Sequence, residues 1–131
     1  MEVPKFLKNV LIINGAISLI LGFSYITGII NIILDLISFP SFNPLYSYVF
    51  GGTLLVFGIF SLLLLKRKNL ANIKLFMELI IGWKIVVVLT SFLALQITVP
   101  YFIAPIQFIW VNNIIFIFLI LIDLFVYRKY W

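Results

Sequence analysis

The sequence predicts an all-α membrane protein: four transmembrane helices in an antiparallel bundle, with both termini in the cytoplasm. The first observation is composition, because 65% of the 131 residues are hydrophobic and 10% are charged, whereas the apolar content of soluble domains is near half. The second is that the apolar residues form four long runs, each near the roughly 20 residues that a helix needs to cross a bilayer. The third is the position of the basic residues.

Eight of the nine Lys and Arg residues lie beside the apolar runs and fall in three places. They precede the first run, separate the second from the third, or follow the fourth: Lys5, Lys8, Lys66, Arg67, Lys68, Lys74, Arg128 and Lys129. The two other connections carry no Lys or Arg. By the positive-inside rule the basic segments are cytoplasmic. We therefore expect a multi-pass protein of the cell membrane with its N- and C-termini inside.

Proline residues mark the connections on the outer side. Pro40 and Pro44 interrupt the chain between the first two runs, and Pro100 and Pro105 interrupt it between the last two, where a helix interior would be broken. Four spans use most of the chain, so residues 1–131 are expected to form a single domain. The expected helices cover residues 7–28, 45–65, 73–98 and 101–127.

The segment after the first run has two interpretations. Asn31 and Asp35 stand four residues apart among Ile and Leu residues, a spacing that favours a short amphipathic turn on the outer membrane surface. The same residues also fit a lengthened first helix.

Small residues follow one stripe on each of the first two helices. In lipid, small residues let helix backbones approach closely, so these two helices are expected to pack tightly. No phosphate-loop spacing surrounds the glycines, so a packing role is expected rather than a ligand-binding one. The packing residues are Gly15, Ser18 and Gly22 on the first helix and Ser47, Gly51 and Gly58 on the second.

Four polar residues lie within the cytoplasmic half of the predicted spans. An ionisable group at bilayer depth costs about 2.5–3.5 kcal/mol on insertion scales and rarely stays unpaired. We expect Lys84 to pair with Asp123, and Glu78 to pair with Lys74 or to meet Asn14. At 1.5 Å of helix rise per residue, the depths below the nearest basic residue are ~6 Å for Glu78, ~7 Å for Asp123, ~9 Å for Asn14 and ~15 Å for Lys84.

This polar cluster has three interpretations. It joins the helices through an ion pair and amide hydrogen bonds, or it forms an ion- or proton-responsive site or the wall of a small cavity, or it pairs with another chain. The line predicted to face Lys84 on the fourth helix holds Asn112, Phe116, Leu119 and Asp123. Gln96, Gln107 and the Asn112–Asn113 pair are expected to bridge the last two helices or to line a vestibule.

Several function classes are not expected. The chain has no Cys and no His, the ligands on which zinc, haem, copper and iron–sulfur sites most depend, so we expect no cofactor and no metal. Catalysis is not expected, because no third group that would position a substrate accompanies Glu78 and Asp123. The net charge of +5 matches anionic lipid headgroups rather than nucleic acid.

The glycine-containing second helix and the basic segment after it, Gly51-Gly52 through Lys66-Arg67-Lys68, resemble the DoxX-like group of small four-helix membrane proteins. The resemblance covers this short segment and implies an accessory role. We accordingly expect an accessory or assembly subunit of a membrane complex, with the lipid bilayer and either another membrane protein or further copies of the chain as partners. The alternative is a small oligomeric transporter or channel that uses Lys84, Asp123 and Glu78.

Overall fold

The computed structural model of the protein describes residues 3–37, 44–67, 69–96 and 106–131. Within these ranges the chain is helical, and four of the five helices are long and apolar enough to cross a membrane. This confirms the predicted all-helical class and the number of candidate spans. The helices are α1 (Lys5–Ile26), α2 (Ile29–Leu36), α3 (Pro44–Arg67), α4 (Leu70–Gln96) and α5 (Ile106–Tyr130).

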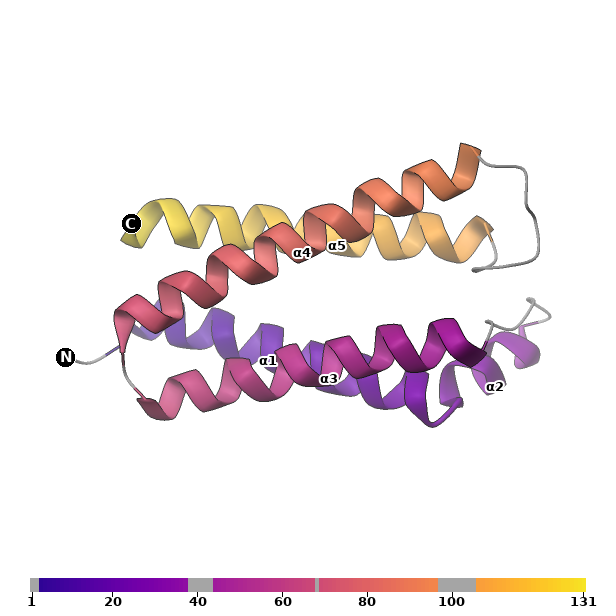
Figure 1. Cartoon of the computed structure of the whole chain (residues 1–131), viewed down its shortest axis with the longest axis horizontal. Helices are drawn as coiled ribbons and strands as arrows, with labels where there is room; N and C mark the ends of the chain where they lie inside the picture. The colour runs from indigo at the N-terminus through magenta and orange to yellow at the C-terminus, as the bar shows by residue number, and fades with distance from the viewer. Residues whose placement is uncertain (1–2, 38–43, 68, 97–105) are drawn as a thin grey trace.

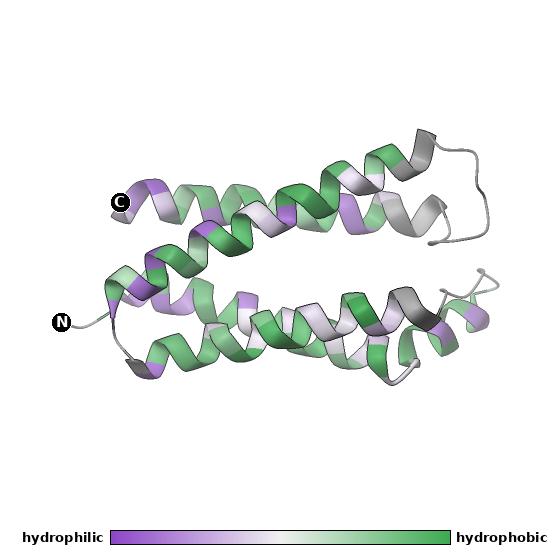
Figure 2. Cartoon of the chain, in the orientation of Figure 1, coloured by the Kyte–Doolittle hydropathy of each residue, from purple (hydrophilic) through white to green (hydrophobic). Residues whose placement is uncertain are grey.

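The four long helices lie along the longest axis of the molecule as two pairs (Figure 1). α1 packs along α3, and α4 packs along α5. Both termini and the link from α3 to α4 lie at one end, and α2 lies at the other (Figure 1). Polar residues are frequent at the end with the termini, whereas the helices between the two ends are mostly apolar (Figure 2).

The outer surface of the molecule is apolar. Large hydrophobic side chains are exposed on every one of the five helices, among them Ile20, Leu36, Val49, Leu75 and Ile114. In water such a surface would drive aggregation, but in a bilayer it contacts lipid tails. Apolar side chains therefore lie both inside the bundle and on its surface, unlike those of a soluble protein, which are concentrated in the interior.

Four helix ends lie two or three residues beyond the predicted ones, whereas α1 ends at Ile26, two residues before the predicted residue 28. α3 includes Arg67 and α5 extends to Tyr130, because a helix need not end where the membrane does. α4 begins at Leu70 rather than at residue 73, since the Asn69 side chain accepts hydrogen bonds from the backbone N–H groups of Ala71 and Asn72 at 3.0 and 3.4 Å, as an N-cap does. The predicted residues 97–98 and 101–105 lie outside the described residues.

A separate helix, α2, follows the first span, so the lengthened first helix is wrong. α1 ends at Ile26, and Gly28 adopts φ 76°, a left-handed conformation that favours glycine and interrupts the helix. Ile30 and Leu34 of α2 are buried, whereas Asp35 is exposed on another face. α2 therefore has the amphipathic character that the Asn31–Asp35 spacing predicts.

The pair α1–α3 is held by close backbone approach. A Cβ added to Gly22 would lie 2.8 Å from the carbonyl oxygen of Gly51, and one added to Gly51 would lie 2.9 Å from that of Gly22. At Gly58 an added Cβ would lie 2.7 Å from Leu19 Cγ. These distances are shorter than van der Waals contact, so no larger residue fits without a shift of the helices.

The other small residues on this interface are also enclosed. Gly15 faces Leu62, with 3.1 Å from an added Cβ to its Cδ2, and Ser18 and Ser47 are buried. Sequence reasoning did not include Ser61, whose hydroxyl donates a hydrogen bond to the Leu11 carbonyl across the interface at 2.8 Å. Ser61 stands three residues after Gly58 and therefore on the same face of the helix, which is the pattern that could have identified it from the sequence.

Trp83 packs between two apolar clusters that fill the interior. The cluster nearer the termini includes Leu11 and Met77, and the other includes Phe50 and Phe116; Trp83 packs against both. Its ring centroid lies 4.9 Å from that of Phe57 and 5.7 Å from that of Phe116. The residue that follows it, Lys84, is thereby placed at the junction of the two clusters.

Candidate functional site

Three polar side chains from three helices form a closed ring in the interior. The Lys84 ammonium on α4 lies 2.5 Å from Oδ2 of Asp123 on α5 and donates a second hydrogen bond, 2.8 Å long, to Oδ1 of Asn14 on α1. The Nδ2 group of Asn14 donates to the other carboxylate oxygen, Oδ1 of Asp123, at 2.7 Å. Each of the three side chains therefore contacts the other two. We call this set the polar ring.

The polar ring is sealed from the surface. The exposed fractions are 0% for Asp123, 2% for Lys84 and 4% for Asn14. A buried charge is tolerated only when it is paired and hydrogen-bonded, and here the carboxylate has one donor at each oxygen. The opposite charges of Lys84 and Asp123 cancel, so the ring as a whole is neutral.

The amide of Asn14 has a defined orientation in the ring. An ammonium is only a donor and an ionised carboxylate only an acceptor, so a residue that bridges them must offer one acceptor and one donor. Asn14 does this with Oδ1 toward Lys84 and Nδ2 toward Asp123. A carboxylate at this position would lack the donor for Asp123, and an aliphatic residue would lack both groups.

Side-chain length explains how Lys84 meets two shallower partners. Its Cα is ~15 Å below the basic boundary, against ~7 Å for Asp123 and ~9 Å for Asn14. The four-carbon stem of lysine carries its ammonium several ångströms toward the surface. The depths that looked unequal along the helices therefore converge at the Lys84 head group.

Chemically, the ring acts as a cross-link between α1 and the pair α4–α5. A hydrogen bond to a charged group contributes about 1.5–3 kcal/mol, while the desolvation of a buried ion pair offsets much of its attraction. The net stabilisation is therefore moderate. The geometric consequence is larger, because the ring forms only at one rotation and one height of each helix.

Glu78 belongs to a separate pair nearer the termini. Its carboxylate accepts a hydrogen bond from the Tyr127 hydroxyl at 2.5 Å and lies 3.8 Å from the Lys74 ammonium. The expected pairing with Lys74 is confirmed. The expected alternative, a contact with Asn14, is not formed, because the Asn14 amide is engaged in the polar ring. Close to half of the Glu78 side chain is exposed.

Sequence reasoning did not connect Tyr127 with Glu78. The signal was depth: Tyr127 stands one residue before the basic boundary at Arg128, close to the level of Glu78. Tyrosine at this level fits the interfacial belt equally well, which is why spacing alone did not single it out.

On α5 the buried amide is Asn113, not the predicted Asn112. Asn113 is 1% exposed and lies on the buried line with Phe116, Leu119 and Asp123, whereas Asn112 is only half-buried. The prediction used 100° per residue over three turns, but a buried line follows the neighbouring helices and drifts from that ideal. The side chains of Gln96 and Gln107 lie outside the described residues.

In the part of the chain that the structure describes, two buried side chains have polar atoms without a hydrogen-bond partner. They are the amide of Asn113, at both Nδ2 and Oδ1, and the hydroxyl of Ser47. Buried polar groups in folded proteins are nearly always hydrogen-bonded to protein or to an ordered water.

Among the residues that the structure describes, no group of three or more His, Cys, Asp or Glu side chains could hold a metal ion.

Known proteins add no assignment to this geometry. Comparison of the chain with protein-family models, with curated proteins and with solved structures found no match. The resemblance to the DoxX-like group therefore stays a prediction.

Proposed function

We propose that this is an integral protein of the cytoplasmic membrane, with both termini in the cytoplasm, that serves as an accessory or assembly subunit of a membrane complex without catalysis of its own. The four long helices then form an antiparallel bundle. The orientation is supported by the basic residues at the end that holds both termini, among them Lys5, Lys66 and Arg128. At the other end, α2 carries no Lys or Arg.

α2 fits a position at a membrane surface. Its buried residues Ile30 and Leu34 face the bundle, its exposed Ile32 and Leu36 face another side, and Asp35 points to a third. Such a helix lies in a membrane interface, with its apolar side in the acyl region and its polar side toward water. We place it on the outer surface.

The observation that carries the functional proposal is the closed polar ring. Lys84 and Asp123 are the charges deepest in the bundle, and each is hydrogen-bonded to the other and to Asn14. Charges that are paired in this way hold the helices in register. The outer faces of the helices then remain available to bind a partner protein. An accessory subunit needs such a rigid frame, because its partners bind the outer faces of the helices.

Native mass spectrometry tests this role. The tagged protein is extracted gently from its own membranes, and the expected result is a second, different membrane protein in a fixed ratio. Detection of homo-oligomers alone would contradict the proposal. The same extraction from cells that carry the protein without its tag serves as the control for contaminants.

Cysteine labelling tests the orientation separately. The chain has no Cys, so each introduced thiol is unique. Asp35→Cys on α2 is expected to react with a membrane-impermeant maleimide on intact cells, and Lys129→Cys is expected to react only after the membrane is opened. The reverse pattern would overturn the proposed orientation without bearing on the partner.

A second candidate, a small oligomeric transporter or channel, is favoured by Asn113. This buried amide has no hydrogen-bond partner and lies on the same line of α5 as Asp123. A water bound at Asn113 would therefore extend the polar interior into the half of the bundle that lies opposite the termini. For this candidate, Lys84→Leu is expected to leave a stable protein that no longer moves solute across liposomes. The accessory proposal expects an effect on stability instead.

A further inference from the structure

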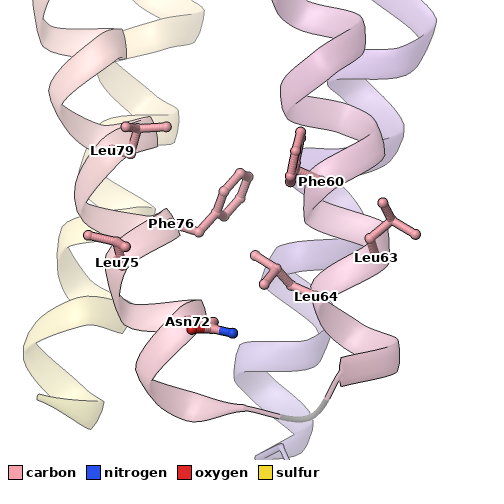
Figure 3. A pocket seen from close by; sticks show the side chains of 7 residues that line it. All are labelled: Phe60, Leu63, Leu64, Asn72, Leu75, Phe76 and Leu79. Carbon is pink, nitrogen blue, oxygen red and sulfur yellow. The ribbon is translucent and has the colours of Figure 1, made fainter.

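An apolar groove lies between α3 and α4 near the end that holds the termini (Figure 3). Its volume is about 370 Å³, within the range of about 300–1,000 Å³ that is usual for small-molecule sites. α4 slopes away from α3 beyond the short link between them (Figure 1), which leaves the groove open along its side. Six apolar residues and Asn72 line it.

The groove has a buried floor and exposed walls. Leu64 and Phe76 are buried and form the floor, whereas Phe60 on α3 and Leu75 and Leu79 on α4 are exposed and form the walls. From Asn72 to Leu79, seven steps of helix rise, the groove extends about 10 Å along α4. This is most of one leaflet, since the hydrocarbon core of a bilayer is roughly 30 Å thick.

Both walls end in polar residues at the same end of the groove. On α4 the lining residues Asn72, Leu75, Phe76 and Leu79 follow the spacing i, i+3, i+4, i+7, which defines one helix face. On α3 the lining residues Phe60, Leu63 and Leu64 follow the same spacing, and the exposed Lys66 stands one turn beyond Leu63. The groove is therefore apolar inside the bilayer and polar at its mouth.

The link between α3 and α4 is rich in basic residues. Lys66, Arg67 and Lys68 are consecutive, and the sequence contains no Asp or Glu from residue 36 to residue 77. The next acidic residue along the sequence is Glu78, which contacts Lys74 and Tyr127. Lys66 is exposed. Close by in the sequence, no acidic residue accompanies this basic run.

We propose that this groove is a binding site for an anionic phospholipid, with one acyl chain between α3 and α4 and the phosphate headgroup beside Lys66 and Asn72, next to the basic link between the two helices. Basic pockets between transmembrane helices bind anionic headgroups in this way. An acyl chain gains little free energy when it moves from contact with other lipids into the groove. The apolar walls therefore position the lipid, and the basic residues select an anionic headgroup. In the proposed orientation this lipid belongs to the inner leaflet. The choice of leaflet rests on that orientation, whereas the site itself does not.

Photo-crosslinking of the purified full chain tests the proposal. The protein is reconstituted in phosphatidylcholine vesicles that contain a small fraction of either phosphatidylglycerol or phosphatidylcholine with a photoactivatable acyl chain. We expect the phosphatidylglycerol label to attach preferentially to residues 60–79. Equal labelling of this segment by both lipids would overturn the proposal, and because no partner chain is present, that result would not depend on the accessory role.

Charge removal tests the headgroup contact. The double variant Lys66→Gln/Arg67→Gln is expected to reduce the preference for phosphatidylglycerol at residues 60–79 about fivefold for each charge removed. The matched control, Arg128→Gln/Lys129→Gln, removes two charges from the same end of the molecule and is expected to leave the preference unchanged. Equal loss in both variants would show a general surface charge effect and would contradict a defined site.

A substitution in the wall tests the acyl contact. Leu79→Trp fills the groove and is expected to lower labelling of its other wall at residues 60–64. Leu89→Trp is the control, because Leu89 lies on the same helix with the same exposed fraction, 57%, as Leu79 but outside the groove. Unchanged labelling in Leu79→Trp would overturn the placement of the chain in the groove.

Discussion

The Lys84 ammonium lies 2.5 Å from Oδ2 of Asp123, and both residues are buried. The two residues come from neighbouring helices and are 39 positions apart in the sequence. Their partner Asn14 adds a third helix to the contact. The charges of Lys84 and Asp123 are therefore part of the interior of the bundle.

Removing one charge of the pair is expected to be costly, and removing both is expected to cost little. Lys84→Leu or Asp123→Leu alone leaves an unpaired buried charge, for which about 3–5 kcal/mol of stability is lost. The double variant Lys84→Leu/Asp123→Leu removes the charge and its desolvation together, so its loss is expected to be smaller than that of either single variant. Unfolding titrations in mixed detergent micelles measure all three. A double variant as unstable as the worse single variant would show that the pair does not act as one unit.

Asn14→Leu provides a second check on the ring. It removes one donor and one acceptor from buried charged partners, and the expected loss is about 1–3 kcal/mol. Asn9→Leu is the matched control, because Asn9 is exposed on the same helix and its replacement should change stability little. Equal effects of the two substitutions would argue against a specific role of the Asn14 amide.

Adding a methyl group at Gly22 or Gly51 is expected to separate α1 from α3. In each case the new Cβ would lie under 3 Å from a backbone oxygen of the other helix, and backbone cannot move aside as a flexible side chain can. Overpacking of this kind costs about 1–3 kcal/mol. The same unfolding titration measures it for Gly22→Ala and Gly51→Ala.

Two other glycines supply the control for that experiment. An added Cβ at Gly52 or Gly82 meets nothing within 4 Å, and alanine is a better helix former than glycine by roughly 1 kcal/mol. Gly52→Ala and Gly82→Ala are therefore expected to be neutral or stabilising. Destabilisation by all four substitutions would mean that glycine is needed along these helices for a reason other than close approach.

Asn113→Leu is expected to stabilise the protein. The Asn113 amide is buried with neither polar atom hydrogen-bonded, and an unsatisfied buried polar group costs about 1–3 kcal/mol. A leucine of similar size removes that cost. A loss of stability would instead indicate that an internal water satisfies the amide, and it would strengthen the transporter candidate over the accessory one.

Tyr127→Phe is expected to have little effect on stability. The hydroxyl donates to Glu78, whose side chain is close to half exposed and lies 3.8 Å from Lys74, so water and Lys74 replace the lost hydrogen bond. The contrast with Asp123→Leu is the informative measurement. A loss as large as that of Asp123→Leu would place Glu78 in the structural core rather than at the interface.

Several features of this chain follow from the sequence because their causes are local. The four apolar stretches are visible without a fold, since the length and composition of a span depend on the bilayer rather than on neighbouring helices. The pairing of Lys84 with Asp123 also followed from local terms: an ion at that depth requires a partner, and Asp123 was available on a neighbouring stripe. α2 was one of two open interpretations, since the sequence did not show that Gly28 would adopt a positive φ.

Other features depended on how the helices rotate and cross. Asn112 and Asn113 are adjacent in the sequence, and only the packing of α5 against its neighbours decides which of them is buried. One predicted alternative was a contact between Glu78 and Asn14, because the two residues have similar depths. Depth along a helix says nothing about distance across the bundle, and in the structure Glu78 accepts a hydrogen bond from Tyr127 instead. The groove between α3 and α4 was not foreseen, because it arises from the angle between two helices.

The sequence by itself determined that the chain is helical, how many of its segments are long and apolar enough to span a membrane, and which side chains lie too deep to remain unpaired. These properties depend on residue composition and on the fixed rise of a helix. The tertiary structure alone decided that Asn14 completes the ring, which asparagine is buried, and where an apolar groove lies between α3 and α4. Those outcomes require the rotation and crossing of every helix at once, and they are set by the close approach of Gly22 to Gly51 and by side-chain contacts between residues far apart in the chain.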